Sequence, residues 1–197
     1  MWYAYVTPTV RRPYVVAERF VRAEDIYASL HSGFRSVYFY SESTVQRILE
    51  RRHFRNLQTE VVRSEELLLD FDSKPDAAYA LANTLAADDI SFRLFTSGNR
   101  SVHLHVSIEP MEGTTVGQAQ REWVRTHAPD ADQTIYHNTA LYRLPGTWHE
   151  KNPGHRKSLL AEHKGRYNLI IGPWTRKPPA SLNEVKAKAH PRILSLA

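Results

Sequence analysis

The sequence predicts an α+β protein with a largely antiparallel central sheet. An apolar run over 66–73 precedes an Ala- and Leu-rich stretch over 76–89, which indicates a buried strand followed by a helix. Two further strand-like segments follow over 91–98 and 101–110, with a glycine turn between them. This strand–helix–strand–strand order predicts a split β-α-β unit at the centre of the chain.

The segment 101–110 carries the clearest strand pattern, because Val102, Leu104, Val106 and Ile108 alternate with polar residues. Together with its neighbours it resembles a split β-α-β unit of the RNA-recognition kind, so an RRM-like core is expected. The later patterns predict one more helix, over 115–128, and three more strands, over 138–148, 156–163 and 166–172.

We expect three parts: a smaller N-terminal α/β lobe over 1–60, the core over 61–175, and a C-terminal tail with a helix over 176–197. In the lobe, 23–31 has the pattern of a short helix and 36–42 alternates like a strand. Ser43 or Thr44 could then cap a helix that continues over 45–54.

The overall composition indicates a folded protein with a basic surface. Its 197 residues are 42% hydrophobic, and the net charge is +5, so a polyanionic partner is plausible. The absence of cysteine excludes disulfides and metal sites built on thiolates. No stretch has the length and apolarity of a membrane span, and we expect a cytoplasmic protein.

Asp70 and Asp72 end the apolar run over 66–73. Residues i and i+2 of a strand point to the same side, which places the two carboxylates about 6–7 Å apart at the backbone. Like charges this close favour a hard divalent ion such as Mg²⁺ or Mn²⁺ between them. The alternative is that both acids lie in solvent at a strand end and cap the next helix.

A second polar motif, over 97–103, leads from a glycine turn into the next strand. Strand alternation puts Ser101 and His103 on one face, where a hydroxyl, an imidazole and backbone amides could cradle a phosphate beside Arg100. The alternative is a polar hairpin turn with a surface histidine, and His105 on the same face shows that histidine is common here.

Asp132 and Arg143 form the third motif. An arginine that leaves a strand beside carboxylates could bind a triphosphate through two parallel hydrogen bonds. The alternative is that Asp132 is a loop residue near Asp130, and that Arg143 makes an ion pair on the surface.

The order of these three motifs resembles the catalytic core of archaeo-eukaryotic primases and primase-polymerases. The matching pieces are LLLDFD, SGNRSVHLHV and DQTIYHNTALYRLPGTWHEK, within residues 66–160. The resemblance implies that Asp70, Asp72 and Asp132 bind two divalent ions, Mg²⁺ or Mn²⁺. Many relatives carry glutamate where Asp72 stands. A cysteine-based zinc module for priming is absent from this sequence or lies on another protein.

The resemblance also implies a nucleotide-binding set, made of Ser101, His103, Arg143, and Lys151 or Arg100 as helpers. A template must be held as well, and the best candidates for binding its backbone are the arginines at helical spacing, Arg47, Arg51, Arg52 and Arg55. That helix face could instead simply be solvated. Further candidates are Arg11, Arg12, Lys157, Lys164, Arg166, Arg176 and Lys177. Trp148 and Trp174 could stack on bases, although large aromatic residues more often lie in a core.

The expected function is therefore template-dependent joining of dNTPs or NTPs on single-stranded DNA with a primer, with a helicase or other replication protein as a further partner. One alternative is a non-catalytic nucleic-acid-binding domain of a replication initiator, which needs no metal. Another is a metal-dependent nuclease that uses Asp70, Asp72, His103 and Asp132. Metal-dependent incorporation of dNTPs distinguishes these functions.

Overall fold

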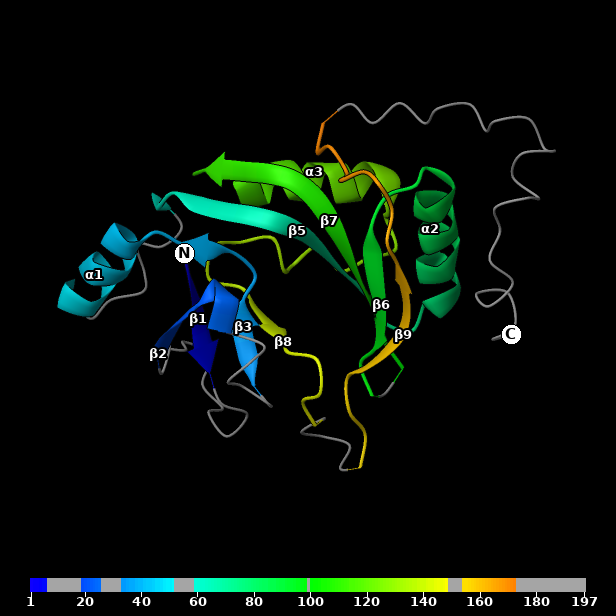
Figure 1. Cartoon of the computed structure of the whole chain (residues 1–197), viewed down its shortest axis with the longest axis horizontal. Helices are drawn as coiled ribbons and strands as arrows, with labels where there is room; N and C mark the ends of the chain where they lie inside the picture. Colours follow the sequence, from blue (N-terminus) through cyan, green and yellow to red (C-terminus); the bar gives the residue numbers. More distant parts are fainter. Residues whose placement is uncertain (7–18, 26–32, 52–58, 99, 149–153, 173–197) are drawn as a thin grey trace.

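The computed structural model describes residues 1–6, 19–25, 33–51, 59–98, 100–148 and 154–172 (Figure 1). Within these ranges, three α-helices and nine strands form the α+β fold with the large antiparallel sheet that the sequence predicts. The helices are α1 (Glu42–Arg51), α2 (Pro75–Ala87) and α3 (Val116–His127), with a 3₁₀ turn at Ala23–Asp25. None of the helices in these ranges is long and apolar enough to cross a membrane.

The strands are β1 (Trp2–Val6), β2 (Arg19–Arg22), β3 (Phe34–Ser36), β4 (Phe39–Tyr40), β5 (Val62–Phe71), β6 (Phe92–Thr96), β7 (Val102–Gly113), β8 (Leu141–Arg143) and β9 (Ser158–His163). Their order in the sheet is β8-β3-β1-β4-β5-β7-β6-β9, with β2 paired to β1. Both β5 and β6 pair with β7 in the antiparallel sense, so they run parallel to each other and α2 connects them. This is the arrangement of a split β-α-β unit.

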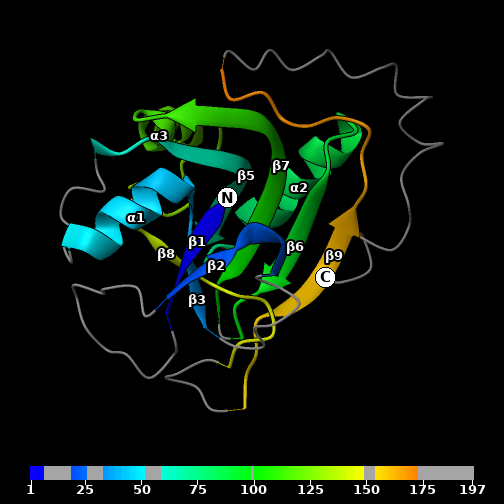
Figure 2. The ribbon, with the colours of Figure 1, turned by 60° about the vertical axis from the view of Figure 1, so that its left-hand side comes forward.

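The helices α2 and α3 cover one face of β5, β7 and β6 (Figure 1). Leu67, Leu69 and Phe71 alternate along β5 toward this side and are buried with Leu85 of α2 and Trp123 of α3. The apolar alternation of the central strands is therefore explained by this helical layer. Strands β1 and β3 lie on the opposite side of the central strands, as the turned view shows (Figure 2).

The other face of the central strands is polar. Asp70 lies directly opposite His103 in the pairing of β5 with β7, and His105 follows two residues later on the same face. The ring of Tyr142, from β8, covers this face with its centroid 4.9 Å from that of His103 and 5.3 Å from that of His105. Polar side chains thus lie on this face around Asp70, while Leu68 and Tyr142 also belong to a buried apolar cluster on the same side.

Several predicted elements differ from the structure. The single strand expected over 36–42 is two strands, because β3 pairs with β1 and β8 whereas β4 pairs with β5, and a bend separates them. The cap of α1 is Ser41, whose hydroxyl accepts the N–H of Thr44, instead of Ser43 or Thr44. Residues 166–172 make isolated bridges only, and most of 23–31 and the tail 176–197 lie outside the described ranges.

Candidate active site

Asp70 is the centre of the candidate site, one residue before the end of β5. Its Oδ2 lies 3.5 Å from Nε2 of His103, which is 6% exposed. Burial lowers the pKa of His103, so this imidazole is neutral and the contact is not an ion pair. The other carboxylate oxygen, Oδ1, is buried and accepts no hydrogen bond from the described residues.

Asp132 lies beside Asp70, although the two are far apart in the sequence. The backbone N–H of Asp132 donates to the carbonyl of Asp70 at 2.7 Å. The carboxylate of Asp132 is oriented by Thr134, whose N–H and hydroxyl donate to its two oxygens at 2.8 Å each. The hydroxyls of Tyr136 and Tyr142 tie the following segment to further backbone carbonyls of β5. The segment after α3 is thus fixed against the strand that carries Asp70.

The electrostatics of Asp70 reflect this convergence. Burial, and then repulsion by Asp132 and Asp72, raises the pKa of Asp70 to about 6. A cation would relieve that repulsion and would supply a partner for the buried Oδ1, so these residues fit a divalent ion in their chemistry. In the described part of the chain, however, no group of three or more His, Asp or Glu side chains is already arranged to hold a metal.

The predicted phosphate-binding turn contacts the acids directly. The hydroxyl of Ser101 donates to Oδ1 of Asp72 at 3.1 Å, and Nε of Arg100 donates to the same oxygen at 3.3 Å. Arg143 approaches the turn from β8 and donates from Nη1 to the carbonyl of Ser97 at 3.1 Å. The structure therefore brings these donors together at the end of β5, while Lys151 lies outside the described ranges.

Gly98 gives the turn its shape. Its φ is +83°, a value that side chains rarely allow, and a Cβ at this position would lie 2.9 Å from the backbone N and O of Arg156. The turn and the segment at Arg156 consequently pack backbone against backbone, which only glycine permits.

We expect Gly98→Ala to lower the free energy of unfolding by about 2–3 kcal/mol, because it combines backbone strain with a clash that the backbone cannot easily avoid. Gly154→Ala is the matched control, since Gly154 has a φ of +96° but a Cβ added there would have nothing within 4 Å. The control should cost only the strain, about 1 kcal/mol. Urea unfolding measures both losses, and equal losses would contradict close packing at Gly98.

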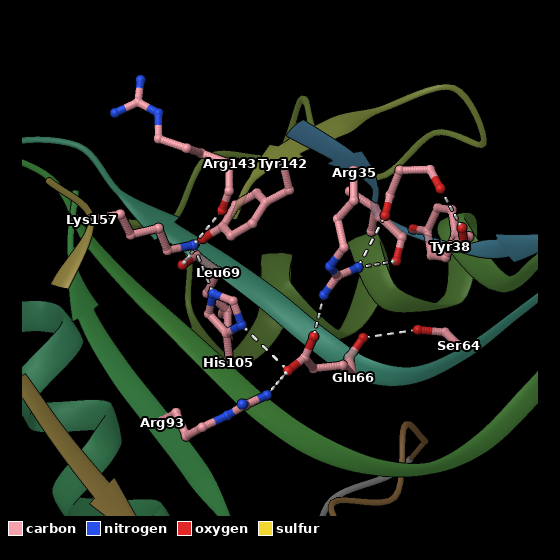
Figure 3. A network of polar contacts seen from close by, with 12 residues as sticks. Arg35, Tyr38, Ser64, Glu66, Leu69, Arg93, His105, Tyr142, Arg143 and Lys157 are labelled. Atoms are coloured by element: carbon pink, nitrogen blue, oxygen red, sulfur yellow. Dashed lines mark hydrogen bonds and ion pairs between the residues drawn. The ribbon is translucent and has the colours of Figure 1, made fainter. Parts of the chain in front are cut away.

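A buried charge network lies on the same polar face, next to the acids (Figure 3). Glu66 of β5 accepts hydrogen bonds from Arg35, Arg93 and His105. Burial alone would raise the pKa of Glu66, but His105 and then the two arginines outweigh it and hold the pKa far below its usual range. Burial lowers the pKa of His105 to about 3, so its imidazole is neutral.

Lys157 extends the network toward Arg143. Its Nζ lies 2.9 Å from Nε2 of His105 and donates to the carbonyl of Arg143 at 2.9 Å. Lys157 is only 1% exposed, so the expectation that it contacts a template was wrong. Glu66 and Thr134 also organise the site, although the sequence did not predict this role for them. The local indications were that Glu66 shares one face of its strand with Asp70, and that His103 shares one face of the next paired strand with His105.

The predicted template-binding helix lies elsewhere. Glu60, just before β5, accepts hydrogen bonds from Arg47, which offsets the charge of that arginine. Strand rise places Val62, at the start of β5, at most about 26 Å from Asp70. The side chain of Arg51, together with Arg52 and Arg55, lies outside the described residues.

Comparison with known proteins gives one structural similarity. No protein-family model matches the chain, and no curated protein matches it. A solved polymerase domain is similar in structure. It is the polymerase domain of ligase D from Mycobacterium tuberculosis in complex with DNA, with a TM-score of 0.44 and 11% identity, covering 81% of this chain and 72% of that one. At this level of similarity, any functional conclusion depends on the site residues of this chain.

Proposed function

We propose that this chain is a primase-polymerase, a nucleotidyltransferase that joins nucleoside triphosphates along a single-stranded DNA template. The observation that carries this proposal is the convergence at Asp70. Asp72 and Asp132 repel its charge, and its buried Oδ1 has no partner among the described residues. Carboxylates that repel one another in this way, beside Arg100 and Arg143, suit a reaction between polyanions, because such a reaction requires cations to neutralise the negative charge of the reactants.

In this proposal, Asp70, Asp72 and Asp132 hold divalent ions, Mg²⁺ or Mn²⁺. When bound, such ions neutralise charge on the triphosphate and on the attacking and leaving oxygens. Arg100 and Ser101 now contact Asp72, and they are positioned to transfer their hydrogen bonds to phosphate oxygens. The neutral imidazole of His103 orients Asp70 without competing for its charge.

The three acids favour the transferase over a domain that only binds nucleic acid. Such a domain gains nothing from three carboxylates, because they repel the phosphate backbone. A nuclease would use the same acids, and the two enzymes differ in what happens to a DNA strand. Extension of a primer and shortening of a strand are both visible with an end-labelled oligonucleotide.

The test is primer extension on a single-stranded template with Mn²⁺ or Mg²⁺. Wild-type protein should lengthen the primer, and Asp72→Asn or Asp132→Asn should reduce incorporation by about 100-fold or more. Asp130→Asn is the matched control, because Asp130 lies in the same loop and pairs with Lys74 on the surface. Normal incorporation by either active-site variant would refute the assignment. Shortened strands would indicate a nuclease, and binding without incorporation would indicate an initiator domain.

A further inference from the structure

Trp148 is a large aromatic side chain on a firmly held backbone. It is 47% exposed, whereas Thr147 beside it is 0% exposed. Two backbone hydrogen bonds fix this segment to the strand-like partner that precedes β9: Gly146 N–H to Lys157 O at 2.8 Å and Lys157 N–H to Thr147 O at 3.1 Å. The exposed indole therefore follows directly on backbone that is hydrogen-bonded to a neighbouring segment.

Arg156 completes an aromatic–cation pair with this indole. The two residues face each other across an isolated antiparallel bridge, and the guanidinium carbon of Arg156 lies 3.9 Å from the ring centroid of Trp148. Exposed aromatic rings combined with arginine are the means by which proteins bind single-stranded nucleic acid, because every base can stack and every phosphate can pair with a cation.

The position of the pair connects it to the candidate active site. The backbone of Arg156 packs against Gly98, in the turn between β6 and β7. Arg100 and Ser101 of the same turn contact Asp72. The Trp148–Arg156 pair is thus joined, through the backbone of Arg156, to the turn whose residues Arg100 and Ser101 contact a predicted metal ligand.

We propose that Trp148 and Arg156 form a stacking platform for a base of single-stranded DNA, with Arg156 also pairing with a backbone phosphate. This inference rests on the proposed function, and it assigns to Trp148 and Arg156 the role of holding the DNA strand near the candidate active site. The charge around it favours this occupant. Arg143 donates to Ser97 of the turn, Arg100 belongs to the same turn, and Arg156 packs its backbone against Gly98 of that turn, so a polyanion complements this region. A single exposed aromatic ring beside arginines is better suited to stacking on a nucleic-acid base than to contacting the apolar surface of a protein partner.

The test measures DNA binding without catalysis. The full chain is titrated in EDTA at low ionic strength into fluorescein-labelled oligothymidylate, and anisotropy gives the affinity. Trp148→Ala should weaken binding about 10-fold, within the range expected for losing one stacked base, while Trp148→Phe should retain most of the affinity. Because the indole is exposed, both variants should unfold at the wild-type temperature.

Tyr167→Ala is the matched control. Tyr167 is 52% exposed and has Arg166 5.5 Å above its ring, but it bridges to Ile90, at the opposite end of β6 from Gly98. This variant should bind DNA as wild type does. The proposal is overturned if Trp148→Ala keeps wild-type affinity or if both alanine variants lose affinity equally.

The platform and the proposed function can fail separately. If the wild type incorporates no nucleotide but Trp148→Ala still loses DNA affinity, the platform stands and the polymerase assignment fails. If incorporation is normal and Trp148→Ala binds DNA as tightly as the wild type, the platform fails and the polymerase assignment stands.

Discussion

Asp70→Asn should abolish nucleotide incorporation and, at the same time, make the metal-free protein more stable at neutral pH. The amide keeps the shape of the carboxylate but removes the charge that Asp132 and Asp72 repel. Loss of that charge should reduce incorporation by about 100-fold or more, since a neutral amide is a poor ligand for a divalent ion. The gain in stability distinguishes an acid kept for function from one that stabilises the fold. Replacing an acid that stabilises the fold would lower the free energy of unfolding.

The size and pH window of this gain follow from the pKa. Asp70 titrates at its ordinary value of 3.8 when unfolded and at about 6 in the folded protein. Protonated Asp70 therefore favours the folded state, and its contribution is complete below pH 3.8 and lost as the pH rises through 6. With about 1.4 kcal/mol for each pKa unit, the variant should exceed the wild type by about 2–3 kcal/mol above that window.

Urea unfolding in EDTA, repeated between acidic and neutral pH, measures this difference. The two proteins should have nearly equal stability at the acidic end and diverge as Asp70 ionises. Adding Mn²⁺ should stabilise the wild type and leave the variant unchanged, by the linkage between binding and folding. A variant that is less stable than the wild type at neutral pH would contradict the repulsion at this site.

The central β5–α2–β6–β7 unit could be predicted because its signals are local. The apolar alternation of β7 and the Ala- and Leu-rich composition of α2 each depend on nearby residues, and the helical layer explains both. Alternation also places Asp70 on the opposite face from Phe71, but Asp72 follows the end of β5 in a turn, so a face shared by the two acids stays a prediction. Local patterns fix which face a side chain occupies, and these predictions needed nothing more.

The surroundings of the acids could not be predicted, because they depend on pairing between distant segments. Strand β8 pairs with β3, which brings Arg143 opposite Phe34 and places Tyr142 over the histidines of β7. Periodicity shows that Glu66 shares a face with Asp70, but it does not show that Arg35 covers it. The same dependence on distant pairing explains why the position of Lys157 could not be predicted. Its charge indicates a surface residue, but the fold of the sheet buries it.

Glu66→Gln should lower the free energy of unfolding more than Asp70→Asn, Gly98→Ala or Glu65→Gln. Arg35 is 1% exposed, and the carboxylate of Glu66 supplies its counter-charge. Glutamine removes that charge, so the guanidinium of Arg35 remains buried without its counter-charge. The NH₂ group of the new amide would also face one of the donors that now contact the carboxylate, which are Arg35, Arg93 and His105. We expect a loss of about 3–5 kcal/mol in the free energy of unfolding. Glu65→Gln is the neighbouring control, since Glu65 is exposed, and its pair with Arg63 should be worth about 1 kcal/mol or less.

The pH dependence and a double variant distinguish this network from a simple packing defect. The folded pKa of Glu66 lies far below its ordinary value of 4.5, so its contribution is complete above pH 4.5 and declines as the pH falls further. The gap between the wild type and Glu66→Gln should therefore narrow only below that pH. Arg35→Met in the Glu66→Gln background should recover part of the loss, because the unpaired cation is then gone. Additive losses in the double variant, or a loss no larger than that of Glu65→Gln, would show that the buried charges are not coupled.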